Sequence, residues 1–176
     1  LANTSFNGLL FNASGPLCIT QEDLESIGNS KSAAINIKSI TVEPRAGNQE
    51  PFWALTHIGG INSVGLPNLG YKAYIQMVPK LKTFTKPIIA SVSGLSIEDN
   101  ETIFKALQDT EIDLIELNTA CPNIEGKAMI GYDFEQTRAL LTRLKLFNKI
   151  PFGLKLPPYL DPILIQEMAE IVKEFE

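Results

Sequence analysis

The sequence contains few of the residues from which disulfide frameworks and metal centres are built. Its 176 residues include two cysteines, Cys18 and Cys121, and a single histidine. Two cysteines form no disulfide framework, and with one histidine they do not supply the ligand spacing of a zinc site. We therefore predict no bound metal and a reducing, cytoplasmic setting.

An excess of basic residues and a long hydrophobic run are also missing. The net charge is −5 and the isoelectric point is about 5.0, so the composition gives no sign of a nucleic-acid-binding surface. No stretch is long and apolar enough to span a bilayer. With 44% hydrophobic and 20% charged residues, the chain has the composition of about one ordinary globular domain. We expect a soluble protein with neither nucleic acid nor membrane as partner.

Short apolar runs alternate with helical patterns along the chain. Strands are expected at residues 9–11, 33–37, 87–92, 113–118 and 151–156. Helix starts are marked by capping patterns at Thr20, Ser96, Asp133 and Asp161, and a further helix is expected at about residues 69–82. This alternation of strands and helices predicts a parallel α/β fold.

One long segment, residues 40–68, interrupts the alternation and is richer in glycine and proline than its surroundings. Loops of this length inside compact domains are usually functional or disordered. Seven apolar side chains predict that the segment packs against the rest of the protein: Phe52, Trp53, Leu55, Ile58, Ile61, Val64 and Leu66.

The most informative stretch is residues 113–123, DLIELNTACPN. Its aliphatic residues can bury on both faces of a parallel sheet, and the polar Asn118, Cys121 and Asn123 follow at the carboxyl end. A lone cysteine near a strand is usually a small buried hydrophobe. Here Pro122 stiffens the loop that carries the thiol, and Asn118 offers a donor and an acceptor beside it, which favours a working thiol.

Polar residues follow the other expected strands as well, at Ser14 and Gly15, Lys38 and Ser39, Ser93 and Gly94, and Lys155. This arrangement is typical of the carboxyl face of a TIM (β/α)8 barrel. A dinucleotide-binding sheet would require a G-x-G-x-x-G motif after the first strand, and residues 12–16 do not provide it. The barrel interpretation is favoured, although about five strands are expected where a barrel has about eight.

Several runs together resemble dihydroorotate dehydrogenase, and most of all its soluble, homodimeric class 1A branch. They are NASG at residues 12–15, KS at 38–39, GINSVGLPNLG at 60–70, ELNTACPN at 116–123 and GLKLPPY at 153–159. The resemblance implies a barrel flavoenzyme of pyrimidine biosynthesis that oxidises (S)-dihydroorotate to orotate on FMN, with fumarate as acceptor. It also implies that residues 1–176 are the N-terminal portion of one barrel domain, because the family's FMN phosphate loops lie beyond Glu176.

The resemblance assigns a role to each matching residue. Cys121 corresponds to the general base and Lys38 to the lysine beneath flavin and substrate. Substrate contacts are implied for Lys38, Asn62, Gly65, Leu66, Asn118 and Asn123. Cofactor contacts are implied for Ala13, Ser14, Gly15, Lys38, Ser39, Asn118 and Lys155. The family usually has leucine and a hydroxyl residue where this chain has Thr119 and Ala120, so the hydroxyl is displaced by one position.

Two other functions stay open at this point. A related flavin-dependent dihydropyrimidine or dihydrouracil dehydrogenase uses a similar cysteine loop, although Asn123 and the Gly126-Lys127 and Tyr132-Asp133-Phe134 runs favour the orotate branch. A barrel scaffold without catalytic activity is the second alternative, suggested by Ala120. Flavin absorbance distinguishes a flavoenzyme from a scaffold, and the rates on dihydroorotate and dihydrouracil distinguish the two enzymes.

Overall fold

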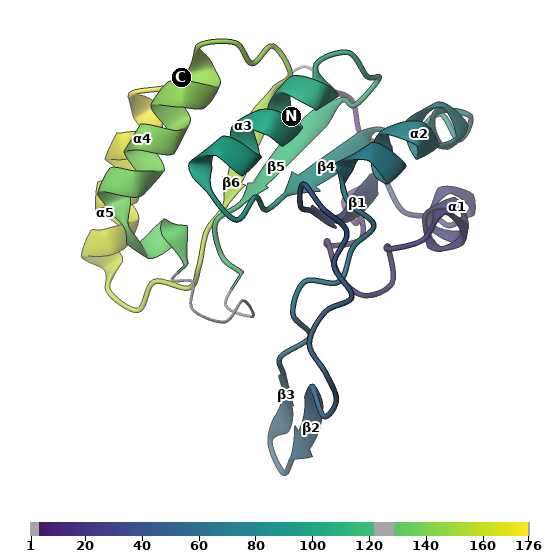
Figure 1. Ribbon diagram of the computed structural model, residues 1–176, viewed down its shortest axis with the longest axis horizontal. Coiled ribbons are helices and arrows are strands. Elements are labelled where there is room, and N and C mark those ends of the chain that lie inside the picture. The colour runs from purple at the N-terminus through teal and green to yellow at the C-terminus, as the bar shows by residue number, and fades with distance from the viewer. Residues whose placement is uncertain (1–3, 122–128, 176) are drawn as a thin grey trace.

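The computed structural model describes residues 4–121 and 129–175 (Figure 1). Its central sheet contains four parallel strands in the order β1 (Ile35–Ile40), β4 (Ile88–Val92), β5 (Leu114–Asn118) and β6 (Phe152–Lys155). The predicted parallel α/β fold is confirmed. All four strands run in the same direction, so their carboxyl ends meet at one edge of the sheet.

Within the described ranges, five α-helices and a short 3-10 turn accompany this sheet (Figure 1). They are α1 (Gln21–Asn29), α2 (Tyr71–Lys82), α3 (Ile97–Leu107), η1 (Ile130–Tyr132), α4 (Phe134–Lys145) and α5 (Pro162–Lys173). The predicted caps form, because Thr20, Ser96, Asp133 and Asp161 each accept a hydrogen bond from a backbone N–H of the first turn. Such bonds satisfy donors that the helix itself leaves unpaired.

The two faces of the sheet differ in chemistry because successive strand residues point to opposite sides. One face carries aliphatic side chains, among them Ile37, Ala90 and Leu117, and belongs to the main hydrophobic core with residues from α1 to α5. The other face carries Ser91 and Glu116, which are register partners on β4 and β5. At the carboxyl end of the strands this second face is polar, while toward the other end it carries a small apolar cluster of Ala34, Ile89 and Leu114. We call its carboxyl-end part the polar face.

The expected first strand, residues 9–11, does not form. Leu9 is 96% exposed and the segment has no strand pairing; the one backbone bond recorded for it is donated by the Ala33 N–H to the Leu10 carbonyl. Three apolar residues that stay exposed gain too little from burial to fix a strand by themselves.

The prediction that residues 40–68 pack against the body is also wrong for most of the segment. Its centre is an antiparallel hairpin of β2 (Trp53–Thr56) and β3 (Gly59–Asn62), which projects away from the parallel sheet (Figure 1). Every residue of both strands is exposed, and Ile58 at the tip is 87% exposed. Burial is confined to the two ends of the segment, at Ile40 and Thr41 and at Gly65, Leu66 and Asn68.

Candidate functional site

The carboxyl edge of the sheet brings several of the predicted site residues together. Lys38 and Ser39 lie in β1, Asn118 ends β5 and Lys155 ends β6, where Asn118 and Lys155 are register partners. The Asn118 Nδ2 donates to Ser39 Oγ at 3.0 Å, so the side chains from β5 and β1 meet across β4, which lies between these strands. Residues that are 79 positions apart in the sequence therefore share one small polar region.

The small-residue loop at residues 13–15 is held against β1. Ser14 Oγ accepts a hydrogen bond from the Ser39 N–H at 2.6 Å, and the Gly15 N–H donates to Cys18 Sγ at 3.2 Å. Burial raises the pKa of the Cys18 thiol, which favours its neutral form. Ala13 is exposed. Ser14, one of the predicted cofactor contacts, thus lies beside Ser39, and Ala13 and Gly15 are its neighbours in the chain.

A line of hydroxyl groups continues from this loop across the polar face. Ser14 Oγ and Ser39 Oγ are 2.8 Å apart, Ser39 Oγ and Ser91 Oγ are 2.9 Å apart, and Ser91 Oγ donates to Glu116 Oε1 at 2.7 Å. We call Ser14, Ser39 and Ser91 the hydroxyl chain. It ends on a carboxylate, and that carboxylate also forms an ion pair with Lys155 Nζ at 3.1 Å.

Lys38 is only 8% exposed, and its ammonium group forms no hydrogen bond or ion pair with any residue in the described part of the chain. Burial lowers the pKa of Lys38, and the charge of Lys155 acts in the same direction, while the Cys18 and Cys121 thiols oppose it. A buried cation without a counter-charge is costly. The arrangement suits a ligand that is rich in acceptors or negatively charged.

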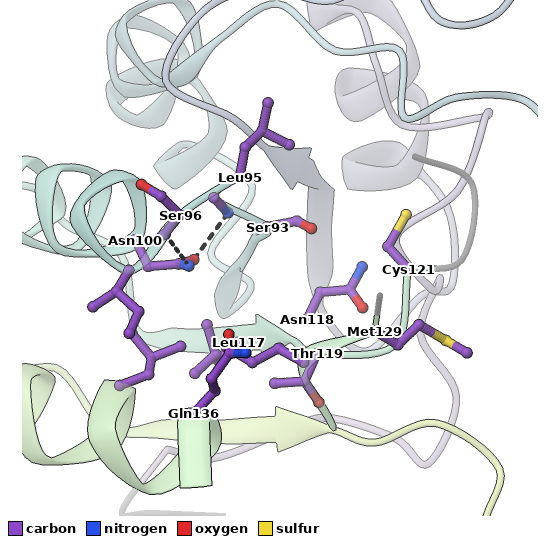
Figure 2. Close-up of a pocket in the computed structure, with 14 residues that line it drawn as sticks. Ser93, Leu95, Ser96, Asn100, Leu117, Asn118, Thr119, Cys121, Met129 and Gln136 are labelled. Carbon is purple, nitrogen blue, oxygen red and sulfur yellow. Dashed lines mark hydrogen bonds between the residues drawn. The ribbon is translucent and has the colours of Figure 1, made fainter. Parts of the chain in front are cut away.

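Cys121 lines a pocket of about 250 Å³ beyond the end of β5 (Figure 2). Asn118 and Thr119 line the same pocket from the strand end, Ser96 from the start of α3 and Gln136 from α4. Lys38 and Lys155 are not among its lining residues. Asn118 connects this pocket to the strand edge that holds the two lysines, because it lines the pocket, donates to Ser39 and is the register partner of Lys155.

The displaced hydroxyl of Thr119 has a structural partner. Thr119 is buried, and its Oγ1 donates to the Lys155 carbonyl oxygen at 2.9 Å while its N–H donates to the same oxygen at 3.1 Å. The hydroxyl is directed to β6 and not toward the Cys121 side chain (Figure 2). It holds the backbone of a predicted cofactor residue in place.

The remaining predicted substrate residues lie elsewhere. Asn62 ends β3 on the exposed hairpin, which Figure 1 shows projecting away from the sheet. Gly65 and Leu66 are buried at the base of the hairpin, and both have a positive φ, of 79° and 58°. A side chain at Gly65 would collide with Asn48, so glycine is required there. Asn123 falls outside the described residues.

The structure adds Glu116 and Ser91 to the site, and neither was given a role from the sequence. A signal was present for Glu116, because a carboxylate inside an otherwise aliphatic strand is rarely tolerated unless it is paired. No such signal marks Ser91, since a serine within a buried strand is compatible with many environments. Only the register of β4 against β5 reveals its contact.

The donor groups fit the flavin that the sequence suggested. Lys38 and Lys155 supply two cations, Asn118 supplies an amide, and residues 13–15 present a backbone of small residues to the same edge. Such a set can bind a ring system that has several carbonyl acceptors and gains negative charge on reduction. Over residues 4–121 and 129–175, no three His, Cys, Asp or Glu side chains converge as a metal site would require. None of the helices in these ranges is long and apolar enough to cross a membrane.

Similar proteins share both the sequence and the fold. The chain is 41% identical over 178 residues to a Streptococcus equi subsp. equi protein whose name assigns it to dihydroorotate dehydrogenase A (fumarate). It is 41% identical over 174 residues to dihydroorotate dehydrogenase (fumarate) from Trypanosoma cruzi. These alignments cover 99% and 97% of this chain but 57% and 55% of the relatives, so the chain spans a little over half their length.

A solved structure is similar in fold. The crystal structure of DHODH in complex with ferulenol from Eimeria tenella superposes with a TM-score of 0.72 at 15% sequence identity, covering 94% of this chain and 53% of that one. The predicted fold class is confirmed: the parallel βα units are those of a TIM barrel, of which the described residues contain four strands. The family model for dihydroorotate dehydrogenase matches residues 1–176, and the chain belongs to the dihydroorotate dehydrogenase family.

Proposed function

We propose that the complete protein oxidises (S)-dihydroorotate to orotate in pyrimidine biosynthesis, with FMN as cofactor and fumarate as electron acceptor. The observation that carries this proposal is the meeting of Lys38, Ser39, Asn118 and Lys155 at one strand edge, next to the pocket that contains Cys121. The names of relatives at about 41% identity support the fumarate branch.

Each residue has a distinct task in this reaction. Cys121 removes the proton from C5 of dihydroorotate, because its thiolate is the only strong base among the polar residues that line the pocket in the described part of the chain. Lys38, Asn118 and Asn123 orient the carboxylate and ring of the substrate, together with Asn62 at the end of β3 and Gly65 and Leu66 at the base of the hairpin. Bound FMN supplies the acceptor for the hydride that leaves C6.

The cofactor is held from several strands in this proposal. Ala13, Ser14 and Gly15 provide the loop that approaches it most closely, and Ser39 and Asn118 lie beside that loop. Lys155 compensates the negative charge that reduction brings. Residues 1–176 form the N-terminal portion of the barrel domain, and the protein is a cytoplasmic homodimer.

Cys121→Ala and Cys121→Ser test the base assignment. In the complete, flavin-loaded protein we expect dihydroorotate to reduce the flavin about 10²- to 10⁴-fold more slowly, the usual contribution of a general base. The flavin content should be retained, because Cys121 touches the substrate and not the cofactor. Stopped-flow absorbance of the flavin measures the rate, and reduction at the wild-type rate would show that another group removes the proton.

The same preparation separates the alternatives. A yellow protein that is reduced by dihydroorotate and not by dihydrouracil supports the proposed substrate. Faster reduction by dihydrouracil would assign the dihydropyrimidine reaction instead, and a colourless protein would favour a scaffold.

A further inference from the structure

Glu116 connects the hydroxyl chain to Lys155 through one oxygen atom. Its Oε1 accepts the Ser91 hydroxyl at 2.7 Å and lies 3.1 Å from Lys155 Nζ. The Lys155 and Glu116 side chains are 35% and 24% exposed, so the pair is partly shielded from water. This carboxylate affects the direction of the hydrogen bonds in the hydroxyl chain through Ser91, and it affects the local charge through Lys155.

The carboxylate determines which hydroxyl donates to which. A serine hydroxyl has one proton and two acceptor positions. Because Ser91 gives its proton to Glu116, Ser39 must donate to Ser91, and Ser14 must then donate to Ser39. Ser39 Oγ also accepts from Asn118 Nδ2, so its bonding capacity is full. The hydroxyl chain has a single direction, and Glu116 is its end.

We propose that Glu116 is a positioning residue that orients the flavin-side hydroxyls and offsets the charge of Lys155, and thereby sets the reduction potential of the bound flavin. The inference rests on the proposed function, because it needs FMN beside Lys155. Glu116 itself touches Lys155 and Ser91, and its influence on the cofactor passes through them. The chemistry of the reaction stays with Cys121 and the flavin.

Glu116→Gln tests the charge. The amide retains the size of the side chain and an acceptor oxygen, but it removes one negative charge next to Lys155. The surroundings become more positive, which stabilises the reduced, more negative flavin. We expect the equilibrium constant for flavin reduction to increase about tenfold, which is ~30 mV in the midpoint potential of a two-electron couple.

Glu101→Gln is the matched control. Glu101 pairs with Arg143 between α3 and α4 and is 16% exposed, so the substitution also removes a partly buried, paired carboxylate, but one whose charged partners are Arg143 and Lys105 and not Lys155. Its thermal midpoint should fall about as much as that of Glu116→Gln, while its flavin potential stays at the wild-type value. An unchanged or lowered potential in Glu116→Gln would overturn the charge role of Glu116.

Ser91→Ala tests the hydroxyl chain while both members of the ion pair stay in place, and it is a near-isosteric change at a fully buried position. Ser39 loses the acceptor for its proton and can rotate, so we expect the dissociation constant of FMN to rise about three- to tenfold, as for one lost hydrogen bond. Wild-type FMN affinity in Ser91→Ala would overturn the orienting role. A wild-type protein that binds no FMN would instead refute the proposed function, and this outcome is distinct from a flavoprotein whose variants behave like wild type.

Discussion

Lys38 is predicted to contact flavin and substrate, and burial of its ammonium group also lowers the stability of the free protein. Its ammonium is buried at the strand edge, and burial lowers its pKa from 10.5. When no ligand is bound, no described residue compensates that charge. A residue that binds an acceptor-rich ligand in this way is expected to destabilise the free protein.

We therefore expect Lys38→Met to stabilise the flavin-free protein by about 1–3 kcal/mol at pH 7, because it removes an uncompensated buried charge. FMN affinity should fall in the same variant. The difference is measured by urea unfolding of both flavin-free proteins, with the exposed Lys31→Met as control. Equal stabilities of Lys38→Met and wild type would mean that the ammonium is well solvated.

The pH dependence of this effect has a defined sign. The folded-state pKa of Lys38 lies below the unfolded value of 10.5. Between the two values the unfolded chain binds more protons, so the stability of the wild type rises with pH across that window. Below the lowered pKa both states are protonated and the cost of burial is fully present. The advantage of Lys38→Met should shrink as the pH approaches 10.5.

Sequence reasoning located most of the strand-edge residues but not their connections. Lys38, Ser39, Asn118 and Lys155 could be predicted because polar residues at the ends of parallel strands share one edge. Their partners could not, since the Ser91–Glu116 contact depends on how β4 is aligned with β5. Glu116 stood within a quoted motif, yet its pairing with Lys155 is a property of the folded sheet.

At the scale of elements, the side chain of Asn12 takes over the pairing that the expected strand at residues 9–11 does not make. Its Nδ2 donates to the Asn36 carbonyl at 2.7 Å, and its Oδ1 accepts the Asn36 N–H at 2.9 Å. An amide side chain has the same donor and acceptor as a peptide group. One side chain thus anchors the loop at residues 13–15 to the outer side of β1.

Asn12→Ala should release this loop. We expect a loss of about 1–3 kcal/mol in the free energy of unfolding, from two hydrogen bonds and an exposed strand edge. Limited proteolysis should cleave residues 8–17 faster than in wild type. Asn7→Ala, at an exposed position in the same segment, is the control. Identical cleavage patterns in all three proteins would show that other contacts hold the loop.

Helices were predicted more reliably than strands, for a local reason. A cap such as Thr20 with Asp23 is completed within four residues, and both of its hydrogen bonds form. The hairpin of β2 and β3 could not be inferred from its apolar content, because those side chains suggested burial. These side chains are exposed because the hairpin projects away from the sheet, and amino-acid composition does not predict the direction in which a segment projects.

For the whole molecule, we call residues 53–62 the arm. All eight residues of its two strands are exposed, while its base is fixed by hydrogen bonds such as Ser63 N–H to the Phe52 carbonyl at 2.8 Å. The arm therefore contributes little to the packing of the body.

Replacing residues 53–62 by Asn-Gly, a two-residue turn suited to hairpins, should change the free energy of unfolding by less than about 0.5 kcal/mol. Chemical denaturation measures this directly. Substrate affinity is the second readout, and it should fall because the replacement deletes Asn62. A large loss of stability would show that the arm supports the body through contacts made at its base.

Asp113, just before β5, forms a charged contact at the amino end of the strand, opposite the carboxyl end where the site lies. Asp113 pairs with Lys82 at 2.8 Å and accepts the Ile88 N–H at 2.7 Å, at the edge of the sheet away from Glu116 and Lys155. β5 is thus tied to its neighbours by a charged group at each end. A slip of one residue would exchange Glu116 with Leu117 and drive a carboxylate into the helix-covered layer. The register of β5, which carries Glu116 and Asn118, is consequently fixed. A shifted register would bury a charge as well as disturb the packing.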